Sequence, residues 1–277
     1  MKSLFTTFSL FAKLLLFLAL FMSAVVIWAL SQFPTSKEIR GCLTTKMFNV
    51  DLCPGGPGYV KLSQISDNLE KAVLISEDSA FYQHNGFDLQ ELENSIKKNL
   101  AEKRFARGGS TISQQLAKNM FLNREKTLTR KVKEAIITLQ LERELSKKEI
   151  LERYLNVVQL GKDIFGVKKA ASFYFKKHPS ELTVLESAFL AFLLPSPEVY
   201  SKSFYKKSLT PFARKRLAQI IDRLYSYNRI SDEQYLSAKV ELEYFLTGTQ
   251  PPPLEAQEIE SLDEEAAALE EELGTTE

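Results

Sequence analysis

The sequence predicts a mainly α-helical, two-lobed domain behind an N-terminal transmembrane helix. Three observations support this fold class: an uncharged apolar stretch near the N-terminus, repeated helix N-cap signals after it, and no long run of alternating apolar and polar residues. Of the 277 residues, 44% are hydrophobic and 26% charged, which excludes collagen-like, low-complexity and wholly disordered chains. Two cysteines and two histidines are too few for a disulfide scaffold or a histidine-rich metal centre.

The first element is a transmembrane anchor within residues 1–33, preceded by a short cytoplasmic stub. Residues 14–30 carry no charge, and the uncharged stretch continues to Phe33, which is long enough to cross a bilayer once. The alternative is a signal peptide cleaved near residues 29–31. Lysines lie on both sides of the stretch, so the positive-inside rule does not fix its orientation.

Residues 34–61 are expected to form an extracytoplasmic linker. Its two cysteines, Cys42 and Cys53, have ten residues between them. In an oxidising compartment they can form a local disulfide, and otherwise they remain two thiols. The spacing does not decide between these alternatives.

Residues 62–250 form the helical body. A capping side chain followed three residues later by an acidic or amide side chain begins a helix, because the pair satisfies free N–H groups of the first turn. Such pairs are Asp88 with Glu91, Thr111 with Gln114, Ser146 with Glu149, Thr183 with Glu186, and Ser231 with Gln234. Ser66 and Thr210, the latter followed by Pro211, are expected to begin two more helices.

The C-terminal residues 251–277 form an acidic tail, which we expect to be disordered or loosely helical. They hold ten acidic residues and no lysine or arginine. The chain's net charge is +1, so removal of ten negative charges leaves +11 on residues 1–250. A basic body suits an anionic partner: nucleic acid, phospholipid headgroups or a phosphorylated substrate.

An acidic pair, Glu77 and Asp78, directly follows an apolar helix. Burial raises the pKa of a carboxyl group, which makes it a better base near neutral pH. The alternative for Glu77 is a salt-bridged helix end. His84 is expected to anchor the following loop by hydrogen bonds, and Asp88 to be a simple N-cap.

Paired glycines at 108–109 precede the next helix start, where free N–H groups can bind an anion. The segment lacks the Gly-Lys-Ser/Thr ending of a P-loop. At helical spacing Thr111, Gln115 and Lys118 share one face, which ends in a cation as a phosphate site would. The alternative is an ordinary solvated face.

A third segment, residues 130–142, carries an apolar stripe of Val132, Ile136 and Leu139. Further apolar residues lie on the other side, so we expect a largely buried helix. Glu134 is then buried with Arg130 one turn away. This pair is either a structural ion pair or part of a charged site.

These segments, in this order, resemble the motifs of glycosyltransferase family 51, the peptidoglycan glycosyltransferases. Residues 77–88 resemble ED-x-x-F-x-x-H-x-G-x-D, residues 108–119 resemble GGST-x-x-QQ-x-x-KN, and residues 130–134 resemble RK-x-x-E. The likeness continues through the KEILERYLN segment at 148–156 and fades after Tyr200. About 75 residues follow, too few for a transpeptidase domain, so a monofunctional enzyme is expected.

The resemblance implies a lysozyme-like fold for residues 62–250, with a small membrane-facing lobe. It also implies a hexosyltransferase that transfers a growing glycan from undecaprenyl pyrophosphate to the 4-OH of lipid II, with inversion. The implied partners are lipid II, the glycan strand, membrane lipid and other cell-wall synthesis proteins. The resemblance also implies a protein that crosses the inner membrane once, with its catalytic domain outside the cytoplasm. Nucleic acid is therefore not an expected partner.

By the same resemblance, Glu77 is the general base and Glu134 orients the cations or a divalent metal. Lys118, Arg130 and Lys131 are expected to hold the pyrophosphate. The other expected substrate-binding residues are Ser110, Thr111, Gln114, Gln115 and Asn119. No cofactor is required, and magnesium or manganese at the pyrophosphate is the metal alternative. The competing functions are a lysozyme-like enzyme that cleaves glycan and an inactive membrane-anchored scaffold.

Overall fold

The computed structural model describes residues 15–25, 27–28, 31–102 and 109–248. The chain divides into two compact units, Met1–Arg40 and Gly41–Glu277. The first unit holds helical residues at 15–25 and 27–28, with exposed side chains, and the short helix α2 (Ser36–Arg40). Among the described residues no helix has the length and apolarity that a bilayer crossing needs. The expected anchor includes Val26, Ala29 and Leu30, which lie outside the described residues.

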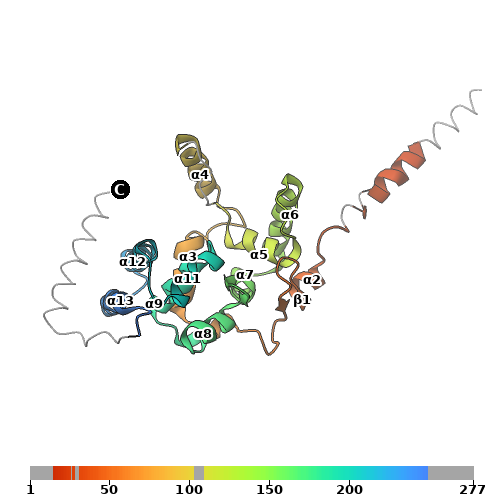
Figure 1. The fold of residues 1–277 in the computed structure, drawn as a ribbon. Helices are drawn as coiled ribbons and strands as arrows, with labels where there is room; N and C mark the ends of the chain where they lie inside the picture. The colour runs from red at the N-terminus through yellow and green to blue at the C-terminus, as the bar shows by residue number, and fades with distance from the viewer. Residues whose placement is uncertain (1–14, 26, 29–30, 103–108, 249–277) are drawn as a thin grey trace, which may run out of the picture. The chain divides into compact units, whose positions relative to one another are not determined.

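The second unit is mainly helical, as predicted (Figure 1). Its longer helices are α3 (Asp67–Glu77), α4 (Leu89–Glu102), α5 (Ile112–Phe121), α6 (Leu128–Glu144), α7 (Lys147–Val157), α8 (Val167–Phe175), α9 (Val184–Leu193), α12 (Pro211–Ser226) and α13 (Asp232–Tyr244). Two single-turn helices, α10 (Pro197–Tyr200) and α11 (Lys202–Tyr205), follow α9. Two antiparallel strand pairs complete it: β1 (Leu43–Thr44) with β2 (Asp51–Leu52), and β3 (Gln159–Gly161) with β4 (Ile164–Phe165).

Most helices begin where the capping pattern predicts. Reciprocal capping boxes form at Thr111, Ser146, Thr183 and Ser231. Ser66 differs: it precedes α3, but its hydroxyl donates to the carbonyl of Leu182 at 2.9 Å instead of capping the helix. The side chain is buried between two segments, so it ties α3 to the chain before α9.

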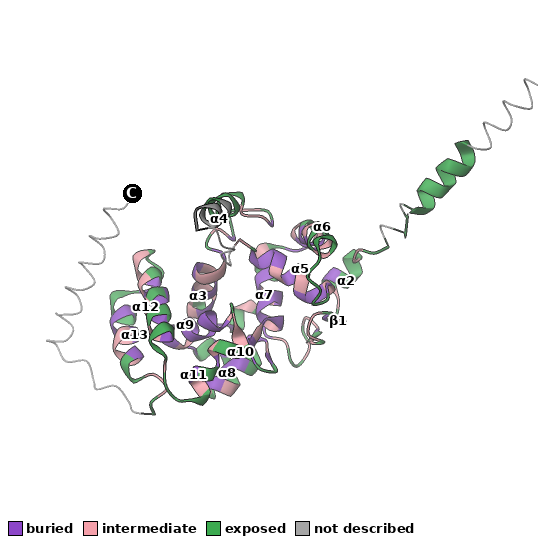
Figure 2. Ribbon diagram, turned by 45° about the horizontal axis from the view of Figure 1, so that its top comes forward, coloured by how far each residue is buried: buried purple, intermediate pink, exposed green. Residues whose placement is uncertain are grey.

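The core contains two groups of packed helices. Helix α9 is buried along nearly its whole length and packs against α3, α12 and α13. Helix α5 packs against α6 and α7 (Figures 1 and 2). The C-terminal end of α3 meets the N-terminal end of α5, because Asp78 accepts a hydrogen bond from the Ile112 N–H at 2.9 Å. The two groups therefore join at the acidic pair singled out in the sequence.

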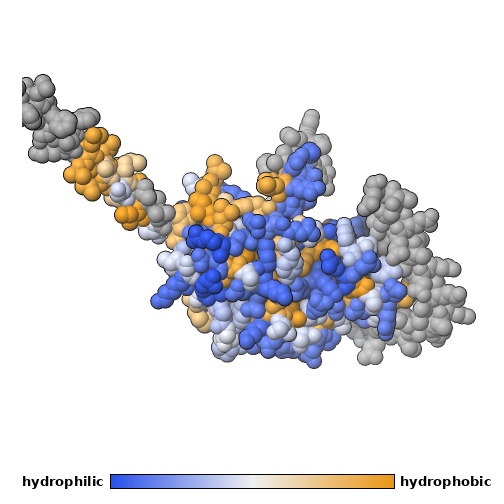
Figure 3. Space-filling view, turned by 180° about the vertical axis from the view of Figure 1, so that it is seen from behind, coloured by the Kyte–Doolittle hydropathy of each residue, from blue (hydrophilic) through white to orange (hydrophobic). Residues whose placement is uncertain are grey.

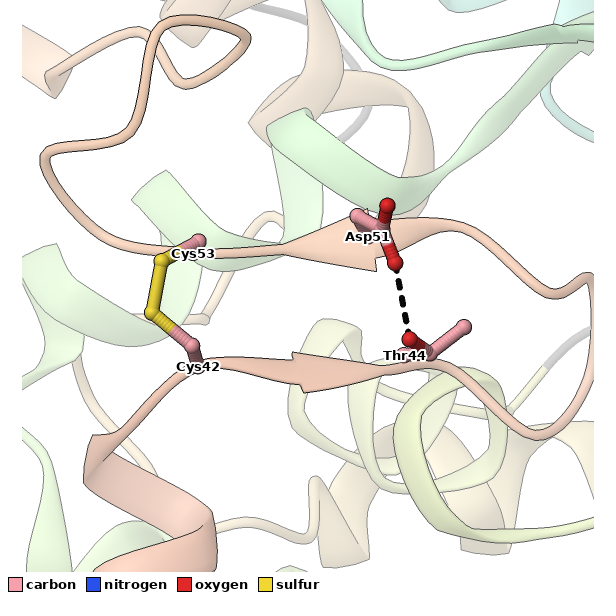
Figure 4. The surroundings of a disulfide bond; sticks show 4 residues. All are labelled: Cys42, Thr44, Asp51 and Cys53. Carbon is pink, nitrogen blue, oxygen red and sulfur yellow. Dashed lines mark hydrogen bonds between the residues drawn. A yellow bond between two sulfur atoms is a disulfide. The ribbon is translucent and has the colours of Figure 1, made fainter.

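Residues 41–61 belong to the same compact unit as the helices. The β1–β2 hairpin is closed by a Cys42–Cys53 disulfide (Figure 4). Its turn lies on the C-terminal end of α5, where the N–H groups of Lys46 and Met47 donate to the carbonyls of Met120 and Asn119 at 3.0 and 3.3 Å. The last carbonyls of a helix lack intrahelical partners, so the hairpin caps α5.

Helix α7 holds the segment that follows the hairpin. The Asn156 side chain pairs with both backbone groups of Val60, at 2.9 and 2.8 Å. Glu152 accepts from the Tyr59 hydroxyl at 2.6 Å and from the Leu62 N–H at 2.7 Å. Burial, and then this carboxylate, raise the pKa of Tyr59. Glu152 and Asn156 of the KEILERYLN segment thus have structural roles.

Helix α6 corrects a sequence expectation. The predicted buried stripe is exposed: Val132 is 53% exposed and Leu139 is 55% exposed. The buried residues of α6 are Glu134, Ile137, Thr138 and Leu141, on the other face. Helix α6 packs against α5 and α7, while the stripe stays 38–55% exposed and presents apolar surface (Figure 3).

Candidate active site

The acidic pair at the end of α3 divides into a structural and a reactive carboxylate. Asp78 is 7% exposed and also accepts from Nε2 of His84 at 3.0 Å. Nδ1 of His84 accepts from the Gly86 N–H at 3.1 Å, so Nε2 carries the proton. His84 is therefore a loop anchor, as predicted, and Asp88 caps α4 through the Glu91 N–H at 2.8 Å, also as predicted.

Glu77 is half-buried and accepts a hydrogen bond at Oε2 from Nε2 of Gln115, at 2.9 Å. Burial raises the pKa of this carboxyl, and the neighbouring Asp78 adds to the rise. The Gln115 hydrogen bond and the charge of Lys118 act against it. A carboxyl group tuned in this way suits proton abstraction near neutral pH.

A pocket of about 280 Å³ lies beside Glu77. It is lined by residues from the ends of three helices and the loop before α5, among them Asp88, Ser110, Thr111 and Arg223. Arg223 is a basic residue on α12 that the motif comparison did not single out. The pocket gives a reacting hydroxyl room next to the Glu77 carboxylate.

Lys118 lies one turn beyond Gln115 on α5, in the middle of a charged cluster that we define as Glu77, Lys118, Arg130, Lys131 and Glu134. Burial lowers the pKa of Lys118, and the positive charges of Arg130 and Lys131 lower it further. The carboxylates of Glu134 and Glu77 oppose this shift. One ammonium thus lies within electrostatic reach of both predicted acids and both predicted cations.

Glu134 is 3% exposed and neutralised by its own helix. Oε2 accepts from Nη1 of Arg130 at 2.8 Å, and Oε1 pairs with Nζ of Lys131. Arg130 and Glu134 thus form the ion pair that their spacing indicated, and Glu134 also pairs with Lys131. Both oxygens of Glu134 are engaged in these ion pairs, and the described residues hold no group of three potential metal ligands.

Some predicted substrate-binding residues lie differently. Gln114 is buried, and its Oε1 accepts from the Thr111 N–H at 3.0 Å, so it is committed to the capping box. Thr111 reaches the pocket, but its hydroxyl donates to the carbonyl of Gly86 at 2.7 Å. Asn119 is 4% exposed at the far end of α5. Of this set, Ser110 is exposed in the pocket lining and Gln115 contacts Glu77.

Sequence reasoning missed two contributors to the site. Tyr154 on α7 donates to Oε1 of Gln115 at 3.2 Å. Glu142 on α6 accepts from Ser113 at 2.5 Å and from Lys147 at 2.7 Å, which joins three helices behind the site. Tyr154 lies far along the chain from Gln115, as Glu142 does from Ser113, and no spacing rule links these pairs.

Comparison with known proteins identifies relatives. The family described as Transglycosylase matches residues 56–225. A biosynthetic peptidoglycan transglycosylase of Nitrosomonas eutropha is 40% identical over 211 residues, which cover 76% of this chain and 86% of that protein. The protein of the same name from Nitrosospira multiformis is 42% identical over 168 residues, covering 61% and 71% of the two chains. That of Alcanivorax borkumensis is 51% identical over 137 residues, covering 50% and 56%.

Proposed function

The chain belongs to the transglycosylase family, and we propose that it polymerises peptidoglycan glycan strands by transfer from undecaprenyl pyrophosphate to the 4-hydroxyl of lipid II. It is a glycosyltransferase of cell-wall synthesis, which replaces the glycan-cleaving and scaffold alternatives. The lysozyme-like, two-lobed form of the fold is part of this proposal. The observation that carries it is the arrangement on α5, where Gln115 donates to Glu77 at 2.9 Å and Lys118, one turn further on, lies within electrostatic range of Arg130 and Lys131.

In the proposed reaction the Glu77 carboxylate accepts the proton of the acceptor hydroxyl. The hydroxyl oxygen attacks the anomeric carbon of the donor, and the bond from that carbon to the pyrophosphate breaks. A single displacement inverts the anomeric centre and needs no covalent enzyme intermediate. Charge grows on the departing pyrophosphate, where Lys118, Arg130 and Lys131 stabilise it.

Glu134 acts in this proposal through its cations, because it holds Arg130 and Lys131 in place. Nε of Arg130 is buried without a hydrogen-bond partner among the described residues, so its guanidinium keeps unused donor capacity. We assign no step to a divalent metal.

We further propose contact with the membrane that carries the lipid substrate. The exposed stripe of α6 offers apolar side chains at helical spacing, the arrangement of a helix that lies on a bilayer. Residues 1–33 would anchor the chain in the inner membrane, with the catalytic domain outside the cytoplasm. The Cys42–Cys53 disulfide suits an oxidising compartment.

The test is lipid II polymerisation by the wild type and Glu77→Gln, with and without magnesium. We expect the variant to fold and to lose activity by roughly 10²–10⁴-fold, the usual contribution of a general base. Glu233→Gln, at an exposed position on α13, is the control and should retain activity. Near-normal polymerisation by Glu77→Gln would remove the base assignment. Cleavage of finished glycan without strand growth would remove the reaction itself.

Measurements of donor affinity test the proposed pyrophosphate site. Lys118→Ala and Arg130→Ala should each weaken donor affinity, because each removes a positive charge from the pyrophosphate site. Lys215→Ala, at an exposed position on α12, is the matched control. Unchanged donor affinity in both variants would contradict the pyrophosphate assignment.

A further inference from the structure

A chain of hydrogen bonds connects a fully buried tyrosine to the proposed base. Tyr154 on α7 has no exposed surface, and its hydroxyl lies 3.2 Å from Oε1 of Gln115. Nε2 of the same amide lies 2.9 Å from Oε2 of Glu77 and 3.4 Å from the carbonyl oxygen of Ser110. The amide of Gln115 therefore stands between a hydroxyl on one side and two acceptors on the other.

The chemistry of the three groups fixes the direction of these bonds. An ionised carboxylate only accepts hydrogen bonds, and so does a carbonyl oxygen. Gln115 must therefore present its NH₂ group to Glu77 and Ser110, which turns its oxygen toward Tyr154. The tyrosine hydroxyl is then the donor. Without the Tyr154 hydroxyl the amide oxygen loses its donor, so the amide is held from one side only and can turn away from the carboxylate.

We propose that Tyr154 is a positioning residue for catalysis: its hydroxyl holds the Gln115 amide in the orientation that donates to Oε2 of Glu77. Among the described residues no hydrogen bond engages Oε1 of Glu77, so Oε1 is the oxygen that takes the acceptor's proton. This inference rests on the proposed role of Glu77. It also gives Gln115 a role in orienting the base instead of binding sugar phosphate.

Burial supports the assignment of Tyr154 as a constant donor. It raises the pKa of the hydroxyl well above its ordinary value, and the carboxylates of Glu77 and Asp78 raise it further. The hydroxyl therefore keeps its proton across the pH range in which an enzyme works.

The chain of hydrogen bonds from Tyr154 through Gln115 to Glu77, here called the relay, predicts a change in the pH dependence of polymerisation. The Gln115 hydrogen bond lowers the pKa of Glu77, so a misoriented amide would let that pKa rise. A general base works only when deprotonated, so a higher pKa moves the acid limb of the activity profile to higher pH. The other charged groups around this end of α3 are Asp78, Lys118 and the pocket residues Asp88, Glu91 and Arg223.

The experiment is the pH–rate profile of lipid II polymerisation for Tyr154→Phe, which removes the hydroxyl and keeps the ring. We expect kcat to fall about tenfold, below the full contribution of a base, with KM for the donor nearly unchanged. The acid limb should move to higher pH. Gln115→Ala should show the same shift, and the double variant should be no worse than Gln115→Ala alone, because both changes break one relay. Gln115→Ala carries the test by itself if Tyr154→Phe does not fold.

Tyr235→Phe is the control, because Tyr235 on α13 is 1% exposed and its hydroxyl donates at 3.2 Å to Asp222 on α12, which is not a member of the charged cluster. It should match Tyr154→Phe in the loss of a buried hydroxyl but leave the pH profile unchanged.

An unmoved acid limb in both Tyr154→Phe and Gln115→Ala would overturn the relay, as would strictly additive losses in the double variant. If Glu77→Gln is inactive while Tyr154→Phe is normal, the relay alone fails. If Glu77→Gln still polymerises lipid II at a near-normal rate, the base assignment on which the relay rests fails as well, while glycan cleavage without strand growth would remove the proposed function.

Discussion

Two neighbouring carboxylates at the end of α3 show how environment separates roles at the scale of single residues. Asp78 is saturated by hydrogen bonds from Ile112 and His84, while Glu77 keeps one oxygen engaged by Gln115 and faces the pocket. Burial alone raises a carboxyl pKa, so the partners decide which of the two acids is available as a base.

Asp78→Asn should destabilise the protein by about 1–3 kcal/mol, because an amide can accept only through its oxygen and would turn its NH₂ toward one of two buried donors. Denaturant unfolding measures this change. The control is Asp67→Asn, since Asp67 is 74% exposed in its pair with Lys71, and a change under about 0.5 kcal/mol is expected there. Equal effects of the two substitutions would mean that the Asp78 bonds add nothing to stability.

Helix α6 shows why amphipathic patterns at the scale of elements need tertiary context. Its stripe and its charged face are equally regular in the sequence, and a helix with apolar residues on two sides is ordinarily buried. The structure buries the side that carries Glu134 and Ile137, because Glu134 is neutralised by Arg130 and Lys131 within the helix.

A triple change of Leu128, Val132 and Leu139 to serine should leave folding nearly intact, because these side chains are 82%, 53% and 55% exposed. Binding to lipid vesicles should weaken, since burial of apolar side chains in a bilayer is lost. Vesicle co-sedimentation measures the effect, and Val199→Ser on α10, at a site 55% exposed, is the control. Vesicle binding that does not change would contradict the proposed membrane contact.

The disulfide hairpin acts on another element, since it caps the helix that carries Gln115 and Lys118. Replacing Cys42 and Cys53 together by serine should lower the free energy of unfolding by about 2–4 kcal/mol, the usual worth of a short disulfide loop. Urea unfolding measures it. Reductant should destabilise the wild type to the same level and leave the double variant unchanged, and a reductant effect on the variant would contradict this account.

At the scale of the whole molecule, charge is divided between a basic body and an acidic tail at residues 251–277. The tail lies outside the described residues, and the proposed site draws all its groups from α3 to α12. We therefore expect removal of residues 251–277 to leave the rate of lipid II polymerisation within about twofold of the rate of the full chain. Salt screens the field of an exposed charge over roughly 10 Å at ordinary ionic strength. A large loss of activity on truncation would give the tail a role in the reaction.

The sequence by itself determined the helical class and the capped helix starts. These depend on local rules, because a cap involves residues three positions apart and a helix face repeats every three to four residues. Three further features were decided only by the tertiary structure: which face of α6 is buried, the packing of residues 41–61 with the body, and the link from Tyr154 through Gln115 to Glu77. Each joins segments far apart in the chain, and only packing brings such segments together.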